Sequence, residues 1–223
     1  MRFRLTIASI ALGAALQFPG GSCAYAAEVA ATVTDNAGRP VKDAVVVAVP
    51  VDGAMHIPSH PHAQILDQID KEFVPKVKAV VMGTPIIFPN HDNVRHQVYS
   101  FSPAKRFELP LYAGVPAKPV VFDKPGVVVL GCNIHDWMIG YVYVSESPWF
   151  AMTGIDGTAT IADVPPGAYV LRVWHPQLNG SEEATRQTLS ISRGQIAAVS
   201  WNLALRPEVR IRRAPAADHP GRY

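Results

Sequence analysis

Apolar residues recur along the chain at the spacings typical of β-strands. Residues 29–33 alternate between apolar and polar positions, which predicts a strand with one buried face. Residues 41–49 are mostly apolar, and this run predicts a strand buried on both faces. The turn-forming sequence Asp-Asn-Ala-Gly-Arg-Pro lies between them at 35–40. We therefore expect residues 28–50 to form a hairpin.

Short apolar segments separated by turn residues continue through the rest of the chain. Their spacing favours a small Greek-key barrel or sandwich in the middle of the chain, followed by a return to the style of the first segment. No segment after residue 20 has an amphipathic helical pattern, so the expected fold class is all-β. The expected strands are 65–69, 77–82, 85–89, 94–101, 106–109, 119–123, 126–131, 139–144, 169–173 and 196–205.

The first 26 residues have the features of a secretory signal peptide. Arg2 and Arg4 are followed by the apolar stretch 5–18, and the small residues Ala24 and Ala26 match a cleavage site. The apolar stretch is too short to span a bilayer. We expect a mature chain that begins near residue 27, is periplasmic or secreted, and has no membrane span. A lipid on Cys23 is the alternative.

Cleavage would also change the charge and the cysteine count. The 20 Lys and Arg residues would lose two, leaving 18 against 18 acidic residues. A neutral chain has no overall field for nucleic acid, so we expect none as a partner. Of the two cysteines only Cys132 would remain. A single thiol has no internal disulfide partner, so it is a buried structural residue, a reactive thiol or a metal ligand.

One short segment concentrates soft and borderline metal donors. Cys132, His135 and Met138 lie between two expected strands and therefore on one tight loop. His96 opens another strand after a polar turn and faces this loop if both turns lie at the same end. Two imidazoles, a thiolate and a thioether form the ligand set of a blue copper site. Zinc bound by Cys and two His is an alternative, as is a chance grouping in which Met138 only fills the core.

These residues resemble the cupredoxins, the group of plastocyanin, azurin and amicyanin, over about residues 64–145. The C-x2-H-x2-M spacing of 132–138 is similar to the short ligand loop of amicyanin, and 122–132 resembles the strand that leads to it. The stretch 90–98 resembles the N-x5-H-x-V strand of the family, which implies His96 as first ligand and not His91.

The resemblance implies one type 1 copper ion held by His96, Cys132, His135 and Met138, and an electron carrier that is not an enzyme. The sequence departs from the family pattern at Leu130, where an aromatic residue is usual. It departs again at 133–134, where Asn-Ile replaces Thr-Pro or Ser-Pro. Neither departure removes a ligand. Proteins labelled methylamine utilization proteins carry a similar domain.

The flanking segments resemble a second family, the transthyretin-like carboxypeptidase regulatory sandwich. The two halves of its motif occur in order at 33–47 and 156–173. The resemblance implies that the cupredoxin domain, 63–148, is inserted into a discontinuous sandwich made of 27–62 and 149–206. Residues 207–223 have no periodicity and are expected to form a disordered tail.

Several further residues are candidates for function. His175 is a possible extra ligand at a strand end that could pack on the copper domain, and Asp136 either orients His135 or is a surface charge. A second metal site or a solvated linker is expected at His56, His60 and His62.

The expected partner is a redox protein that docks near His135. Trp137 and Ile139 beside it would supply an apolar patch. A copper-delivery module and a non-redox binding module of the cell envelope are the alternative functions. The sequence contains no Ser-His-Asp signature, P-loop or paired-carboxylate motif.

Overall fold

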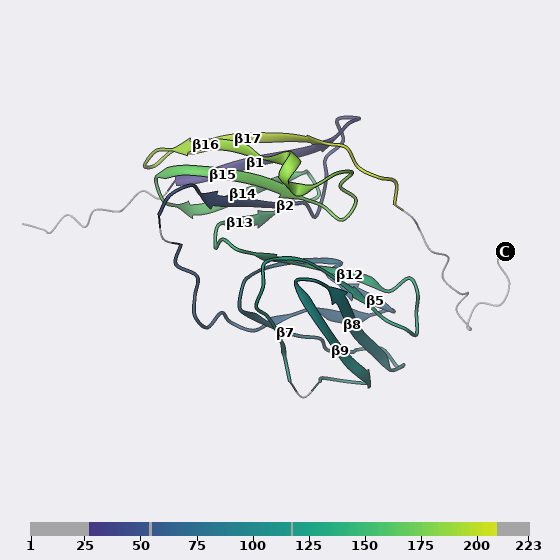
Figure 1. The fold of residues 1–223 in the computed structure, drawn as a ribbon. Coiled ribbons are helices and arrows are strands. Elements are labelled where there is room, and N and C mark those ends of the chain that lie inside the picture. The colour runs from purple at the N-terminus through teal and green to yellow at the C-terminus, as the bar shows by residue number, and fades with distance from the viewer. Residues whose placement is uncertain (1–26, 54, 117, 209–223) are drawn as a thin grey trace, which may run out of the picture.

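The computed structural model describes residues 27–53, 55–116 and 118–208, which fold into two stacked units built of strands (Figure 1). The expected signal peptide lies outside the described residues, as does the expected tail from residue 209 onward. Within the described part, the helical structure is one short 3-10 turn, η1 (Glu182–Thr185). No helix there is long and apolar enough to cross a membrane. The all-β fold class is confirmed.

The first unit takes its strands from both ends of the chain and forms two facing sheets. Their shared core contains alternate residues of strand β1, such as Val29 and Val33, and is closed by Trp201. One sheet has the order β14 (Thr158–Val164), β1 (Ala27–Asp35), β17 (Ile196–Leu203), and the other β13 (Phe150–Met152), β2 (Val45–Pro50), β15 (Gly167–Trp174), β16 (Gln187–Ile191).

The second unit is a sandwich of five strands against three, with a small additional hairpin. Its core is built around Phe88, Phe122 and Leu130, which are all fully buried. The chain crosses between the two sheets, as in Greek-key folds. The larger sheet has the order β6 (Val77–Val81), β12 (Ile139–Ser145), β11 (Gly126–Gly131), β8 (His96–Ser102), β9 (Lys105–Tyr112). The smaller sheet has the order β10 (Val120–Phe122), β7 (Thr84–Ile87), β3 (Gln64–Ile65). The hairpin pairs β4 (Asp67–Ile69) with β5 (Glu72–Val74).

The expected hairpin over residues 28–50 is wrong. Strands β1 and β2 do form, but they belong to different sheets of the first unit. The reason lies in burial: β1 alternates between buried and exposed positions, whereas residues 45–48 of β2 are all buried. A strand buried on both faces needs packing layers on both sides, so β2 lies inside the molecule while β1 lies in the outer sheet.

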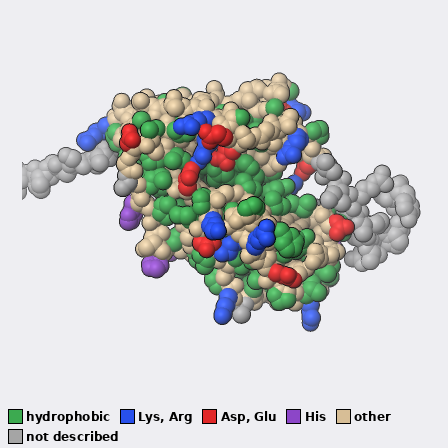
Figure 2. Space-filling model, viewed as in Figure 1, with side chains coloured by type: hydrophobic (Ala, Val, Ile, Leu, Met, Phe, Trp, Pro, Cys, Tyr) green, Lys and Arg blue, Asp and Glu red, His purple; other side chains and the backbone are tan. Residues whose placement is uncertain are grey.

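The two units share an apolar interface that covers the second face of β2. Val45 and Val47 pack there with Val77 and Tyr143 of the second unit. Trp174, at the end of β15, lies with its ring centroid 5.6 Å from that of Tyr143, as expected for a strand end that packs on the second unit. Figure 2 shows hydrophobic side chains gathered along this junction.

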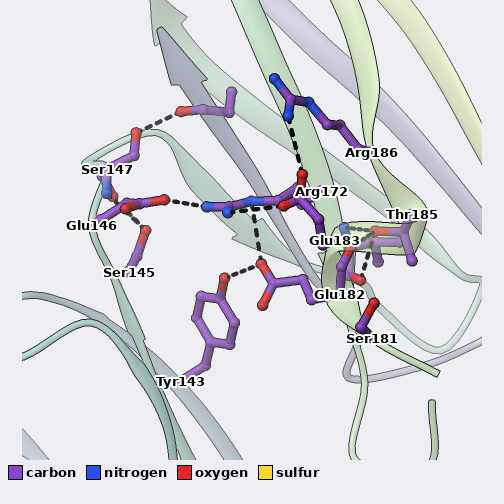
Figure 3. Close-up of polar contacts among 12 residues, drawn as sticks. Tyr143, Ser145, Glu146, Ser147, Arg172, Ser181, Glu182, Glu183, Thr185 and Arg186 are labelled. Carbon is purple, nitrogen blue, oxygen red and sulfur yellow. Dashed lines mark hydrogen bonds and ion pairs between the residues drawn. The ribbon is translucent and has the colours of Figure 1, made fainter. Parts of the chain in front are cut away.

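A charged network lies beside this interface (Figure 3). The hydroxyl of Tyr143 donates a 2.5 Å hydrogen bond to Glu182 of η1. The guanidinium of Arg172 lies among three carboxylates, pairing with Glu146 and lying 3.6 Å from Glu182 and 3.7 Å from Glu183. The network thus joins residues from both units, and Glu182 has the least exposed of its three carboxylate side chains.

Candidate metal centre

Two strand ends and one loop bring the candidate ligands to the same end of the second unit. His96 is the first residue of β8, and Cys132, His135 and Met138 lie on the loop that joins β11 to β12. The last pair of that hairpin is Gly131 with Ile139, so the loop is held at its base. Within it, the amide of Met138 donates a 2.9 Å hydrogen bond to the carbonyl of His135. The loop is therefore closed by its own backbone.

Three donor atoms converge at this end. One ring nitrogen of each of His96 and His135 and the sulfur of Cys132 lie within 4.8 Å of one another. Nδ1 of His96 is 3.8 Å from the sulfur of Cys132, and the two imidazole centroids are 5.1 Å apart. His96 is fully buried and Cys132 is 4% exposed, whereas His135 is half-buried. His135 is thus the donor that lies nearest to solvent.

Met138 lies in the same apolar core as Cys132. Its side chain is 1% exposed and belongs to the cluster that contains Cys132, Leu130 and Val98. Cys132 and Met138 also line one surface hollow together with Tyr99. The structure therefore brings together the three residues with strong donors and places the thioether residue beside them in a largely apolar environment.

A buried polar atom without a hydrogen-bond partner indicates that a metal ion fits here. Nδ1 of His135 is buried and has no hydrogen-bond partner. A buried nitrogen without a partner costs free energy, so such atoms in folded proteins normally bind something. A metal ion bound by this nitrogen together with His96 and Cys132 would satisfy it, and the set of two imidazoles and a thiolate suits copper. The residues present fit the ion that the sequence predicts.

The surroundings favour the neutral form of His135, which is the form that binds metal. Burial lowers the pKa of His135, and electrostatic interactions with His96 and Lys71 lower it further, against a smaller opposite effect of Asp92. The ring of Trp137 packs on it, with centroids 5.0 Å apart. Less protonation means less competition for a metal at neutral pH.

A carboxylate that sequence reasoning missed contacts the other imidazole. Nε2 of His96 lies 2.7 Å from Oδ2 of Asp92. Burial raises the pKa of Asp92, but the hydrogen bonds from His96, Lys71 and Asp70 outweigh that effect and leave it below its usual value. The available signal was the position of Asp92, four residues before His96 in a polar turn.

The other candidates lie outside this cluster. His91 is exposed, with Nδ1 3.3 Å from the carboxylate of Asp67. His175 is half-buried, and its Nδ1 accepts a hydrogen bond from the amide of Gln177. Asp136 is exposed on the loop, as a surface charge would be. The described residues contain one group of three potential metal donors, and the exposed His56, His60 and His62 are not part of it.

Comparisons with known proteins give partial structural likeness only. No protein-family model matches the chain, and no curated protein matches it. A purple cupredoxin from Nitrosopumilus maritimus is 24% identical over 38% of this chain and all of that chain, with a TM-score of 0.33. A reduced amicyanin variant is 18% identical over 44% of this chain and 98% of that chain, with a TM-score of 0.34.

A third solved structure, the copper-containing nitrite reductase of Thermus scotoductus SA-01, is 23% identical and has a TM-score of 0.35. It covers 53% of this chain, which in turn spans only 28% of that protein. Structural likeness at these TM-scores establishes neither the activity of this chain nor which metal it binds. The likeness of the flanks to carboxypeptidase regulatory sandwiches and the link to methylamine utilization stay predictions.

Proposed function

We propose that this chain is an exported electron carrier with one type 1 copper ion bound by His96, Cys132, His135 and Met138. The observation that carries the proposal is the convergence of two imidazole nitrogens and one thiol sulfur within 4.8 Å, in a core that also buries Met138. Bound copper would supply a one-electron couple. Soft sulfur ligands suit Cu(I) and imidazoles suit both oxidation states, so this donor set serves both.

The protein's own residues supply rigidity and insulation. His96 and Cys132 are buried in the second unit, one at a strand end and the other directly after a strand, so their positions are fixed by the sheet. The apolar residues packed around Cys132 and Met138 leave these side chains only 4% and 1% exposed. A site that changes little between oxidation states lowers the cost of moving an electron.

His135 is the proposed point of electron exchange. It is the half-buried donor, and Ile134 beside it is 49% exposed. An apolar surface next to an exposed ligand edge favours brief contact with a partner redox protein. Trp137 and Ile139, also expected in this patch, are half-buried. Export through the segment 1–26, action as a carrier and not an enzyme, and a lack of nucleic-acid partners belong to the same proposal.

The direct test is the visible spectrum of protein loaded with one equivalent of Cu(II). A thiolate bound to Cu(II) gives intense charge-transfer absorption, so the wild type should be strongly coloured. Cys132→Ser should keep the fold and lose the colour, because a hydroxyl cannot supply that transition. A wild type that takes up copper without this absorption would favour a copper-delivery module. A purified protein that binds no metal would favour a non-redox binding module.

A further inference from the structure

The two ring nitrogens of His96 face different partners. Nδ1 points toward the sulfur of Cys132 at 3.8 Å, and Nε2 lies 2.7 Å from Oδ2 of Asp92. An ionised carboxylate only accepts hydrogen bonds, so the proton in this contact belongs to Nε2. In the neutral imidazole, Nδ1 then carries the lone pair on the side of the candidate metal centre. The contact thus sets the tautomer.

Asp92 is itself held in place by a tight turn from another part of the chain. Its Oδ1 accepts a 2.7 Å hydrogen bond from the amide of Asp70, and its Oδ2 accepts a 2.8 Å bond from the amide of Lys71. Both turn residues have positive φ, 54° and 60°, a conformation in which successive amides can face one acceptor. The Asp92 side chain is only 11% exposed. Its carboxylate is therefore fixed before any metal binds.

The turn of Asp70 and Lys71 is held in place by Gln68, which is fully buried in β4. The backbone of Gln68 exchanges hydrogen bonds with Pro89 and His91, on the segment that carries Asp92. Its side-chain amide donates to the hydroxyl of Tyr112 at 2.6 Å. The hairpin of β4 and β5 and the segment before His96 therefore form one connected body. The hairpin of β4 and β5 thereby holds the segment that carries Asp92 in place beside His96.

We infer that Asp92 is a positioning residue that fixes His96 in the Nε2–H tautomer and so presents an unprotonated Nδ1 to the metal centre. The inference rests on the proposed function only in taking this centre as a metal site. A carboxylate behind a ligating imidazole also makes the imidazole a stronger donor, and loss of such a partner costs about 10–100-fold in metal affinity. The hairpin β4–β5 acts through Asp92.

The first experiment uses the metal-free full chain and long-range ¹H–¹⁵N NMR of the histidine rings at neutral pH. We expect His96 to be the Nε2–H tautomer in the wild type, before any metal is added. In Asp92→Asn the side-chain amide can donate to Nε2, so the Nδ1–H tautomer should become populated. A wild-type His96 protonated on Nδ1 would overturn the inference without any variant, even if Asp92→Asn fails to fold.

The second experiment measures the affinity of the metal-free protein for Zn²⁺. Asp92→Asn should bind about 10–100-fold more weakly than wild type. Asp136→Asn is the matched control, since Asp136 is an exposed carboxylate next to His135, and it should bind as wild type does. Equal affinities of wild type and Asp92→Asn would contradict the positioning role.

The experiments distinguish a failure of the positioning role of Asp92 from a failure of the proposed function. If the copper spectrum is that of a blue site but Asp92→Asn changes neither tautomer nor Zn²⁺ affinity, the positioning role is wrong and the proposed function stands. If the tautomer and the Zn²⁺ affinities behave as expected but copper gives no thiolate absorption, the positioning role stands and the proposed function is wrong.

Discussion

The ring of Tyr99 lies directly over Gly131, the residue that precedes Cys132. The two residues are paired across β8 and β11, and a Cβ atom on Gly131 would lie 2.8 Å from both the hydroxyl oxygen and the Cζ of Tyr99. Real Cβ contacts are essentially never that short, so a methyl group on Gly131 would force the half-buried ring of Tyr99 to shift. The absence of a side chain lets the phenol ring cover the strand end beside the candidate metal centre.

Gly131→Ala should therefore destabilise the protein by about 1–3 kcal/mol, the usual cost of overpacking. Urea unfolding of the metal-free protein measures this. Tyr99→Leu removes the ring atoms that the new methyl group would meet, so the same substitution should cost much less in the Tyr99→Leu background. An equal cost in both backgrounds would mean that the clash is not with Tyr99.

His96→Ala and His91→Ala form a matched pair. His96 is buried within the donor cluster, whereas His91 is exposed and contacts Asp67. We expect His96→Ala to abolish the thiolate-to-copper absorption and His91→Ala to leave it unchanged. The opposite pattern would move the first ligand to His91.

Met138 should set the redox potential without being needed for copper binding. On bound copper, an additional weak donor such as the thioether of Met138 would stabilise the electron-poor Cu(II) more than Cu(I), so its loss in Met138→Leu should raise the potential. Met138→Gln supplies a harder oxygen donor and should lower it. Copper should remain bound in both variants, because the imidazoles and the thiolate provide most of the affinity. Protein voltammetry gives the three potentials, and equal values would exclude Met138 from the site.

Much of this site could be predicted from sequence because its residues are local. Cys132, His135 and Met138 lie within seven positions, and a loop between two strands brings them together whatever the rest of the fold does. His96 needed one additional assumption, that its strand starts at the same end. Asp92 was missed because its position four residues before His96 is a weak signal, and the amides of Asp70 and Lys71 that hold its carboxylate cannot be read from the sequence.

The fold shows the same division between local and distant information. Most strands of the second unit lie close to their predicted ranges, since alternation and turn residues are local signals. The hairpin prediction for 28–50 failed because pairing depends on partners far along the chain. Strand β2 pairs with β13 and β15, more than a hundred residues away. Strand β5 was missed because Glu72–Val74 is too short to show alternation.

The partly buried carboxyl group of Glu182, whose side chain is 23% exposed, predicts a specific pH dependence. Burial raises the pKa of Glu182 above its usual 4.5, although the hydrogen bond from Tyr143 and the charge of Arg172 act in the opposite direction. The folded state then binds more protons than the unfolded state, so this group's contribution to stability falls as pH rises above 4.5.

Glu182→Gln should remove that contribution. The free energy of unfolding of Glu182→Gln minus that of wild type should therefore increase between pH 4.5 and pH 7, as measured by urea unfolding. Glu183→Gln is the control, because Glu183 is 60% exposed beside the same Arg172 and should show a much smaller change. A difference for Glu182→Gln that decreases over this range would mean that the ion pair with Arg172 outweighs burial.

The cluster of His96, Cys132 and His135 is proposed to hold copper for reversible electron transfer. An anaerobic redox titration of the copper-loaded full chain, followed at the thiolate-to-copper absorption, tests it most directly. We predict a single one-electron transition that superimposes in the oxidative and reductive directions, with copper retained throughout. Loss of Cu(I) to a competing thiol on reduction, or a transition that does not reverse, would contradict electron transfer and favour copper delivery.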